Sequence, residues 1–348
     1  MKIIRNVFLF SIGFFLTFIA LEVFISNTYI VNKSLNDVYA DIGRGRRTNM
    51  FYVMFNEGFS MGRFNKFRYM GAEYPKEKDV NTLRIALIGD SFVEGFQVFD
   101  RDHFRRIIEV ELSEKLNQNV EVLNFGRSGF DIGDMFAYNQ TFVKEFNPDF
   151  SLFFLSNNDL IPRFSDPLRM KVRLKDDSLI VVKDYPSNYI QIFNRTKYLI
   201  QNSTIFTMLN SGHKLVKSDE FLHIIFDKFY PNKLESDNEY SNSFSEIPFA
   251  LPELTLGIVD NLNSAKDIIV NKDIKSLNQE MVSEIRRHTI NYIDLQDTLY
   301  YMKENQVDPY YWKATKKTGH WNHQAHKAVG EYLAKSLYQI IQQNSAYK

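Results

Sequence analysis

The sequence contains no cysteine and no excess of charge of either sign, and both absences exclude classes of function. Without cysteine, the chain can form no disulfide bond, use no thiolate nucleophile and hold no cysteine-ligated metal. Lysine plus arginine and aspartate plus glutamate each number 42, so the formal net charge is zero. Proteins bind phosphate backbones through basic surfaces, and the balanced charge therefore argues against nucleic acid as a partner.

A long apolar run begins close to the amino terminus. It extends from Val7 to Ile25, and Glu22 is the only charged residue within it. A helix needs about 20 residues to cross the core of a bilayer, so this run has the length of a membrane span. The short apolar region and small-residue cleavage site of a signal peptide are lacking. We therefore predict an uncleaved, single-pass anchor over residues 1–30, with a cleaved signal peptide as the alternative.

Basic residues on the two sides of this run bear on its orientation. Lys2 and Arg5 favour a cytoplasmic amino end, because positively charged flanks are retained on the cytoplasmic side. Arg44, Arg46 and Arg47, beyond the run, favour the opposite orientation. We predict that the rest of the chain lies outside the cytoplasm, in the periplasm or at the cell surface, and is attached to the membrane through the amino-terminal helix.

The chain of 348 residues is long enough for a large core, and beyond residue 80 its strand and helix patterns alternate. Short apolar runs predict buried strands at Arg84–Ile88, Val120–Phe125 and Phe150–Leu155. Helical spacing of apolar residues predicts helices at 104–112 and 132–146. The alternation of strands and helices resumes with a predicted helix near 277–288, a strand at 289–295 and a closing helix after Asn322. Such alternation predicts an α/β fold with a parallel, doubly wound sheet.

Two stretches do not follow this alternation of strands and helices. Residues 31–80 show little periodicity and are predicted to be a lead-in segment that packs on the edge of the domain. Residues 163–250 are predicted to be an insertion that begins with a β-hairpin around a polar turn and continues as helical or irregular structure. The remaining residues of 81–348 are predicted to form one domain.

The stretch from Arg84 to Gly95 carries the strongest chemical signal. An apolar run leads directly into Gly89-Asp90-Ser91. Gly89 is expected to allow a sharp turn, because glycine adopts backbone angles that a side chain forbids. Open α/β sheets bind ligands at the carboxyl ends of their strands, so Ser91 is a candidate nucleophile. In the alternative interpretation, Ser91 merely caps the next helix.

Three further segments carry polar groups that complete a recognisable set. Gly129 and Asn158 follow the second and third predicted strands, and His320 precedes the closing helix. A serine, a histidine, an amide and a glycine N–H are the parts that acyl transfer requires. The serine attacks a carbonyl carbon, the histidine accepts its proton, and the donors stabilise the oxyanion.

This set, in this order, resembles the SGNH (GDSL-type) hydrolase family. Gly89-Asp90-Ser91 matches its first block, Asn124–Gly129 resembles its second, and Ser156–Asp159 resembles its Gly-x-Asn-Asp block with serine in place of glycine. The resemblance implies a flavodoxin-like three-layer fold around a parallel sheet. It also implies the roles of four residues: the nucleophile Ser91, the general base His320, and an oxyanion hole of Ser91 N–H, Gly129 N–H and Asn158.

The catalytic acid is where the sequence departs from the family. The family places an aspartate two or three residues before the histidine, but Thr318 and Lys317 occupy those positions here. Loss of the orienting acid costs a serine triad about four orders of magnitude in rate. The alternatives are a Ser-His dyad, a weakened or inactive enzyme, or a more distant carboxylate from Asp308, Asp294 or Asp297.

We predict a serine esterase or lipase-like hydrolase that acts on acyl esters outside the cytoplasm. Its partners are predicted to be a small-molecule or carbohydrate acyl ester and the membrane, and its substrate, by analogy, acylated surface carbohydrate. The alternatives are an O-acyltransferase of cell-surface polysaccharide and a non-catalytic carbohydrate-binding or assembly protein that retains the fold. We predict no cofactor and no metal, because histidines spaced as His320, His323 and His326 do not stay on one helical face.

Overall fold

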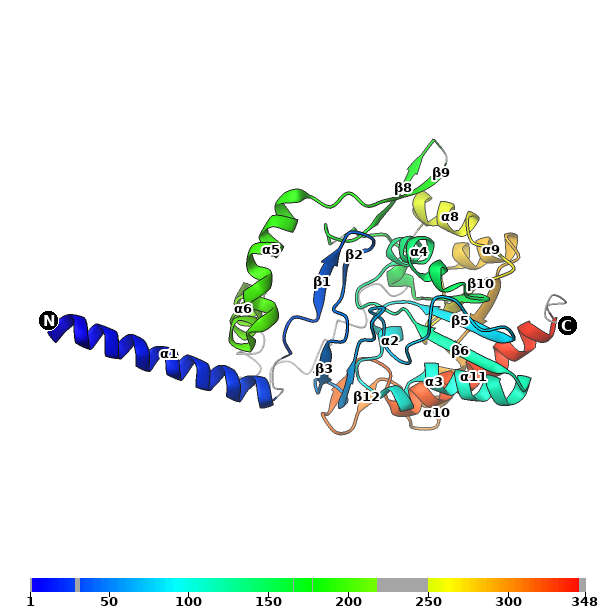
Figure 1. The fold of residues 1–348 in the computed structure, drawn as a ribbon. Helices are drawn as coiled ribbons and strands as arrows, with labels where there is room; N and C mark the ends of the chain where they lie inside the picture. The colour runs from blue at the N-terminus through cyan, green and yellow to red at the C-terminus, as the bar shows by residue number, and fades with distance from the viewer. Residues whose placement is uncertain (1, 29–31, 165, 177, 218–249, 344–348) are drawn as a thin grey trace, which may run out of the picture. The chain divides into compact units, whose positions relative to one another are not determined.

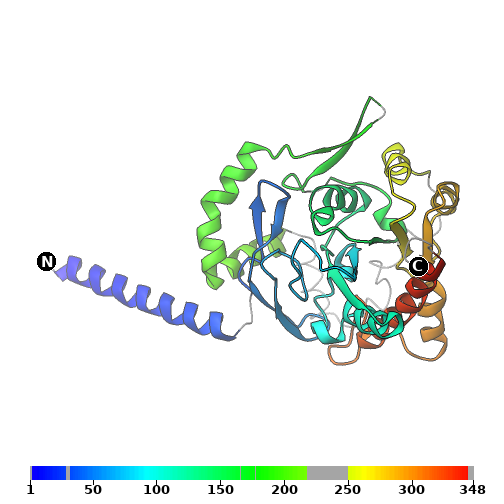
Figure 2. The same ribbon diagram turned by 45° about the vertical axis from the view of Figure 1, so that its right-hand side comes forward.

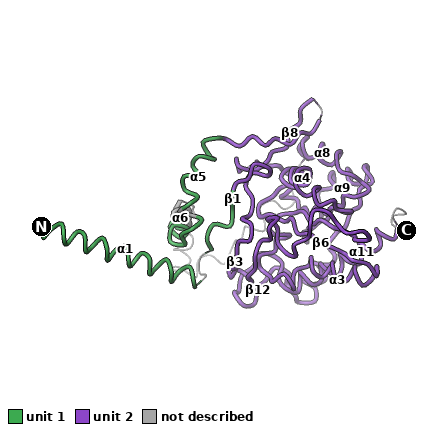
Figure 3. Tube along the Cα trace, in the orientation of Figure 1, with its two compact units in different colours: residues 1–37, 187–245 green, residues 38–186, 246–348 purple. Residues whose placement is uncertain are grey.

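The computed structural model describes residues 2–28, 32–164, 166–176, 178–217 and 250–343 (Figure 1). These residues belong to two compact units (Figure 3). One unit comprises residues 1–37 and 187–245, and the other comprises residues 38–186 and 246–348. The domain boundaries drawn from the sequence stay predictions, and most of the second half of the predicted insertion lies outside the described residues.

A parallel sheet of five strands forms the centre of the larger unit. Its strands lie in the order β11-β10-β7-β5-β6, and all neighbouring pairs are parallel. Numbered along the chain, this is the 2-1-3-4-5 order of flavodoxin-like folds, so the predicted fold class is confirmed. The strands are β5 (Thr82–Ile88), β6 (Asn119–Asn124), β7 (Phe150–Leu155), β10 (Asp267–Asn271) and β11 (Asn291–Asp294).

Helices cover both faces of this sheet because its strands are apolar on both sides. In β5, Ile85 and Leu87 belong to one buried cluster, and Ala86 and Ile88 belong to the other. This alternation is the period of two of an extended strand. Figures 1 and 2 show helices on both sides of the sheet. One layer contains α3 (Phe104–Leu116), α10 (Gln296–Glu304) and α11 (His323–Gln343), and the other contains α4 (Ile132–Thr141), α8 (Glu253–Asp260) and α9 (Gln279–Arg287).

Strand β10 is the element of the sheet that the sequence did not predict. It pairs with β7 on one side and β11 on the other. Its apolar core consists only of Ile268, Ile269 and Val270, all fully buried between Asp267 and Asn271. Three apolar residues are too few to separate a buried strand from a short loop by pattern alone.

Short two-stranded hairpins form in the segments that do not follow the alternating α/β pattern. The residues predicted as a lead-in segment form β1 (Asn36–Tyr39) with β2 (Gly43–Arg46), and β3 (Phe51–Met54) with β4 (Ser60–Arg63). The predicted hairpin at the start of the insertion is present as β8 (Lys171–Lys175) and β9 (Ser178–Val182). A small hairpin of β12 (Tyr311–Trp312) and β13 (Lys317–Thr318) precedes α11.

The smaller unit is helical. Its described helices are α1 (Lys2–Thr28), α5 (Ser187–Asn202) and α6 (Thr204–Lys217). No residue of α1 is buried, although its sequence is strongly apolar. The unit also contains the ion pair between Lys197 of α5 and Asp37, with 2.8 Å between Nζ and Oδ1.

Candidate active site

Ser91 lies where the order of the strands reverses. Strand β5 has β6 on one side and β7 on the other, so the connections that leave β5 and β7 diverge at this edge. Such a switch point is the usual ligand site of an open α/β sheet. Ser91 is the first residue of the short helix α2 (Ser91–Glu94), directly after β5, and it is partly exposed.

The turn into α2 is stabilised by Asp90 and by close packing at Gly89. The carboxylate of Asp90 accepts a hydrogen bond from Phe92 N at 3.0 Å and thereby caps the helix. Gly89 does not have the positive φ that we expected from the sequence. A Cβ at Gly89 would instead lie 2.4 Å from Val93 Cγ2, so the turn excludes a side chain for lack of space.

His320 meets Ser91, as the sequence-based hypothesis requires. The distance from His320 Nε2 to Ser91 Oγ is 2.7 Å. The loop that carries His320 is stabilised by Asn322, whose side-chain amide donates to the carbonyl oxygens of Asp308 and Tyr311 at 2.8 and 3.0 Å. The imidazole also packs against the ring of Phe92, with 4.8 Å between ring centroids.

The partner on the other side of the imidazole is Glu57, which no sequence motif indicates. Its carboxylate oxygens lie 3.1 and 3.0 Å from His320 Nδ1, and Oε2 also accepts the backbone N–H of His320 at 2.8 Å. These contacts assign the proton to Nδ1 and leave Nε2 free to accept the hydroxyl proton of Ser91. Serine, histidine and a carboxylate are therefore connected in series.

The charge state of Glu57 suits this position. Burial alone would raise the pKa of the carboxyl group, but the hydrogen bonds that His320 donates, together with the charge of Lys317, lower it below its ordinary value. The side chain is 13% exposed, compared with 25% for His320. Glu57 is therefore a carboxylate at neutral pH, largely screened from water.

Gly319 makes room for this carboxylate. A Cβ at Gly319 would lie 2.5 to 2.7 Å from the three atoms of the Glu57 carboxylate group. Only a residue without a side chain allows the carboxylate to reach the backbone N–H and the ring of the following histidine. Glu57 itself is 263 residues from His320 in the chain, and no local pattern in the sequence marks it.

Two of the three aspartates named from the sequence, Asp294 and Asp308, make other contacts. The carboxylate of Asp294 accepts hydrogen bonds from Asn271 Nδ2 and Tyr292 OH, at 2.8 and 2.9 Å. The carboxylate of Asp308 accepts the backbone N–H of Tyr310 at 2.9 Å. The carboxylate at the His320 ring is thus supplied by the segment before β5, and the expectation of Asp294 or Asp308 is corrected.

The three predicted oxyanion donors follow three adjacent strands. Ser91, Gly129 and Asn158 come after β5, β6 and β7, which are neighbours in the sheet. Within the described residues, the N–H groups of Ser91 and Gly129 and the side-chain amide of Asn158 make no hydrogen bond to protein. Asn158 is exposed, whereas Asn157 is occupied by hydrogen bonds to Ser276 O and Asn278 N, at 3.0 and 2.8 Å. The arrangement leaves these donors available to a ligand.

Charged side chains hold the loop that carries Gly129. The Arg169 guanidinium donates to Gly129 O at 2.7 Å and to Ser128 O at 3.0 Å. On the other side, Ser128 N donates to the buried carboxylate of Glu94 at 2.9 Å. Arg46 holds that carboxylate through two hydrogen bonds, at 2.7 and 2.6 Å. Because both carbonyl groups are engaged, the peptide planes of this loop are fixed around Gly129, which has a φ of 76°.

A buried ion-pair network joins the ends of three strands below Ser91. The ammonium group of Lys272, which follows β10, lies 2.6 Å from carboxylate oxygens of both Asp90 and Asp159. Burial would lower the pKa of Lys272, but the charges of Asp159 and Asp90 raise it. Asp159 also accepts the N–H and the hydroxyl of Ser156, each at 2.8 Å. Lys272 therefore ties Asp90, the residue before Ser91, to Asp159, the residue after Asn158.

Among solved structures, three similar chains are described by their activities. A two-domain esterase active on acetylated mannans, crystallised with mannopentaose, is 12% identical over 76% of this chain and 50% of its own, with a TM-score of 0.39. The chain thus spans half the length of that esterase. The lipase/acylhydrolase of Enterococcus faecalis is 12% identical; the match covers 74% of this chain and 96% of that one, with a TM-score of 0.39. The lipase Lip_vut3 from a goat rumen metagenome is 16% identical; the match covers 74% of this chain and 98% of that one, with a TM-score of 0.33.

The family assignment rests on the sequence match to a family model. No curated protein matches the chain. The model of the GDSL-like Lipase/Acylhydrolase family matches residues 85–333, a segment that contains Ser91, Gly129, Asn158 and His320. Because this match covers more than half of the sequence, the chain belongs to the GDSL-like lipase/acylhydrolase family of hydrolases that act on ester bonds.

Proposed function

We propose that the protein is a serine esterase that forms an acyl-enzyme on Ser91. The observation that carries this proposal is the distance of 2.7 Å between Ser91 Oγ and His320 Nε2, with Glu57 on the opposite ring nitrogen. A hydroxyl, an imidazole and a carboxylate in series form the relay that activates a serine toward a carbonyl carbon.

In the proposed acylation step, Ser91 Oγ bonds to the carbonyl carbon of the ester while its proton passes to His320 Nε2. The carbonyl oxygen becomes an oxyanion, for which Ser91 N–H, Gly129 N–H and the Asn158 amide are the proposed donors. The negative charge of Glu57 stabilises the imidazolium that forms. His320 then gives the proton to the leaving alcohol as the ester C–O bond breaks, and the acyl group stays on Ser91.

Deacylation repeats these steps with water in place of the serine hydroxyl and releases a carboxylic acid. The proposed substrates are acyl groups on surface carbohydrate, by analogy with membrane-anchored members of the family. A sugar hydroxyl in place of water would yield an O-acyltransferase, since both activities share the acyl-enzyme. The contact between Glu57 and His320 argues against the non-catalytic alternative, because that alternative depended on a missing acid.

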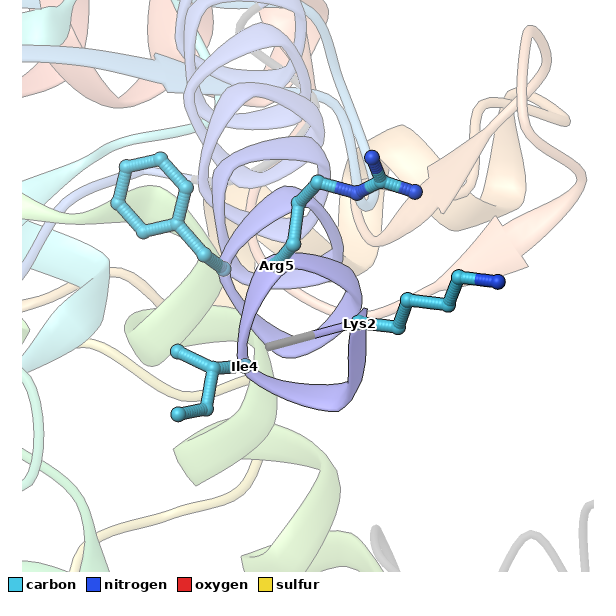
Figure 4. A pocket seen from close by; sticks show the side chains of 4 residues that line it. Lys2, Ile4 and Arg5 are labelled. Atoms are coloured by element: carbon cyan, nitrogen blue, oxygen red, sulfur yellow. The ribbon is translucent and has the colours of Figure 1, made fainter.

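We further propose that α1 anchors the protein in a membrane with the esterase outside the cytoplasm. Within the described residues, α1 is the one helix long and apolar enough to cross a bilayer, and its 27 residues span about 40 Å. Lys2 and Arg5 extend from its first turns on the side away from Ile4 (Figure 4). Basic side chains at this end support a cytoplasmic amino terminus.

The proposal is tested by ester turnover of the detergent-solubilised chain on short-acyl esters and acetylated oligosaccharides. We expect Ser91→Ala and His320→Ala to abolish turnover, and a serine-directed fluorophosphonate to label the parent but not Ser91→Ala. Ser283→Ala is the matched control, because Ser283 is an exposed serine of α9. Turnover by Ser91→Ala at the parent rate would exclude Ser91 as the nucleophile. Addition of a sugar acceptor then compares hydrolysis with acyl transfer.

A further inference from the structure

The acidic residue within the apolar run of α1 has a specific partner. Glu22 accepts hydrogen bonds from Ser203 Oγ and Thr204 N at 2.7 Å, from Thr204 Oγ1 at 2.8 Å and from Ile205 N at 3.1 Å. A carboxylate in an apolar environment is costly unless its oxygens are hydrogen-bonded. The first N–H groups of a helix likewise need acceptors. Glu22 and the beginning of α6 therefore satisfy each other.

The contact between α1 and α6 extends along one face of α1. Phe18, Glu22 and Ile25 are partly covered, whereas most of their neighbours on α1 are exposed. These positions are four and three residues apart and share one side of a helix. The ring of Phe18 lies 6.0 Å from that of Phe206, between centroids. Helix α6 thus contacts α1 at Glu22 and again one turn closer to the amino terminus.

The position of Glu22 along α1 gives the depth of this contact. The apolar run Val7–Ile25 is about 28 Å long as a helix, which is close to the ~30 Å thickness of a bilayer core. Glu22 lies three residues before the end of the run, about 4.5 Å inside it. The contact at Phe18 is another turn deeper, about 6 Å. When α1 spans the bilayer, the first turn of α6 therefore lies at the edge of the hydrocarbon core.

The helices that follow expose apolar side chains. In α6, Phe206, Met208 and Leu209 are 36%, 42% and 58% exposed, although Ile205 is buried. In α5, Ile192 is 59% exposed. Exposed apolar side chains on a helix that begins at the edge of the hydrocarbon core fit the boundary between head groups and acyl chains, where interfacial helices lie.

We propose that α6 is an interfacial membrane helix whose side chains Phe206, Met208 and Leu209 contact lipid acyl chains. Together with α1 and α5, it forms a membrane module that Glu22 holds together. The proposal rests on the proposed anchoring by α1 and is independent of the esterase chemistry. It also requires that α1 is retained, because cleavage after α1 would remove the acceptor of the first turn of α6.

The absence of cysteine allows a direct test with single-cysteine variants of the full chain. A nitroxide is attached at Leu209→Cys, at Leu16→Cys in the centre of the apolar run, and at Glu331→Cys on the exposed surface of α11. The proteins are reconstituted in vesicles of phosphatidylethanolamine and phosphatidylglycerol. Collision rates with oxygen, which concentrates in lipid, and with a water-soluble nickel chelate are then compared. We expect an oxygen-to-nickel ratio at Leu209 several-fold above that at Glu331 and below that at Leu16, as for a site at the edge of the hydrocarbon core.

A second variant tests the role of Glu22. In the background of Glu22→Ala, we expect the ratio at Leu209 to fall toward the value at Glu331, while the ratio at Leu16 stays unchanged. A label at Leu209 that is as accessible to nickel as Glu331 would overturn the proposal. Protection from both reagents would also overturn it, since that result indicates a protein partner such as a second copy. Nickel access at Leu16 would refute the anchor and the module together.

Ester turnover of the labelled proteins is measured separately. Loss of turnover with an unchanged labelling pattern bears only on the proposed esterase, whereas a changed pattern with full turnover bears only on the membrane module.

Discussion

Replacement of Glu57 by glutamine tests the feature of the site that the sequence did not reveal. In the parent, the carboxylate accepts both the ring Nδ1–H and the backbone N–H of His320, at distances of 3.0 and 2.8 Å to the same oxygen. The second oxygen is 3.1 Å from Nδ1. Glutamine has one acceptor oxygen and one NH2 donor. In either orientation of the amide, its NH2 group therefore lies beside the Nδ1–H donor of His320, and the negative charge that stabilises the imidazolium is lost.

The expected magnitude follows from the environment of the carboxylate. Removal of the orienting acid of a fully buried serine triad costs about 10⁴ in rate. Glu57 is 13% exposed, so water can replace part of its role. We therefore expect kcat of Glu57→Gln to fall about 10³-fold, which corresponds to about 4 kcal/mol in the activation free energy. Glu57→Asp keeps the carboxylate charge, but its side chain is one methylene shorter, so the charge lies farther from His320. This variant should retain more activity than Glu57→Gln.

Steady-state kinetics on a short-acyl ester measure this effect. The loss should appear in kcat and in kcat/KM alike, because the imidazolium forms only as the reaction proceeds. The lowered pKa of Glu57 keeps the parent carboxylate charged at neutral and alkaline pH, so the ratio between parent and variant should be constant there. Asp308→Asn is the matched control and should stay close to the parent. A Glu57→Gln rate within about threefold of the parent would refute the relay, given the ~10⁴ that such acids contribute.

Three other changes test the surroundings of the site. Burial and the charge of Arg105 lower the pKa of His103 to about 3, so the unfolded chain binds a proton there that the folded chain does not, and stability falls as pH drops from about 6.5 toward 3. Urea unfolding of His103→Asn should therefore have a pH slope smaller by about 1.4 kcal/mol per unit in that window. Lys272→Met removes the cation shared by the buried Asp159 and the partly buried Asp90 and should cost about 3–5 kcal/mol in the free energy of unfolding, whereas the exposed Lys266→Met should change it by less than about 0.5 kcal/mol. Gly319→Ala puts a Cβ against the Glu57 carboxylate and should lower kcat toward the value of Glu57→Gln, as measured on the same ester.

Local patterns were sufficient to predict the strands that carry the proposed nucleophile and the proposed oxyanion donors. The three strands before Ser91, Gly129 and Asn158 are short, largely apolar and almost entirely buried, and each ends at a polar turn. Both properties are visible within a dozen residues of sequence. The meeting of Ser91 with His320 was predictable only because the family resemblance connects segments that are 229 residues apart.

Residues whose roles depend on contacts with residues far away in the sequence could not be predicted in this way. Glu57 belongs to a segment of hairpins without sustained periodicity, and nothing near it in the sequence refers to His320. Lys272 follows a strand whose apolar core is three residues long, so neither the strand nor the lysine was predicted. His326, which in the sequence stands out only as part of a histidine series, is 1% exposed, and its Nδ1 accepts the backbone N–H of Phe104 at 3.3 Å. In all three cases the tertiary contact, and not the local sequence, determines the role.

The segment before β5 is part of the site and not merely its support. The family match begins at residue 85, yet Glu57 and Arg46 both precede it. Glu57 supplies the carboxylate at His320, and Arg46 neutralises the buried Glu94 that holds Ser128. Both segments belong to the same compact unit as the sheet. In the family pattern, an aspartate two or three residues before the histidine would orient the imidazole ring from the same loop. Here Glu57, from the amino-terminal part of the chain, contacts the ring instead, so the proposed chemistry depends on residues that the family pattern leaves out.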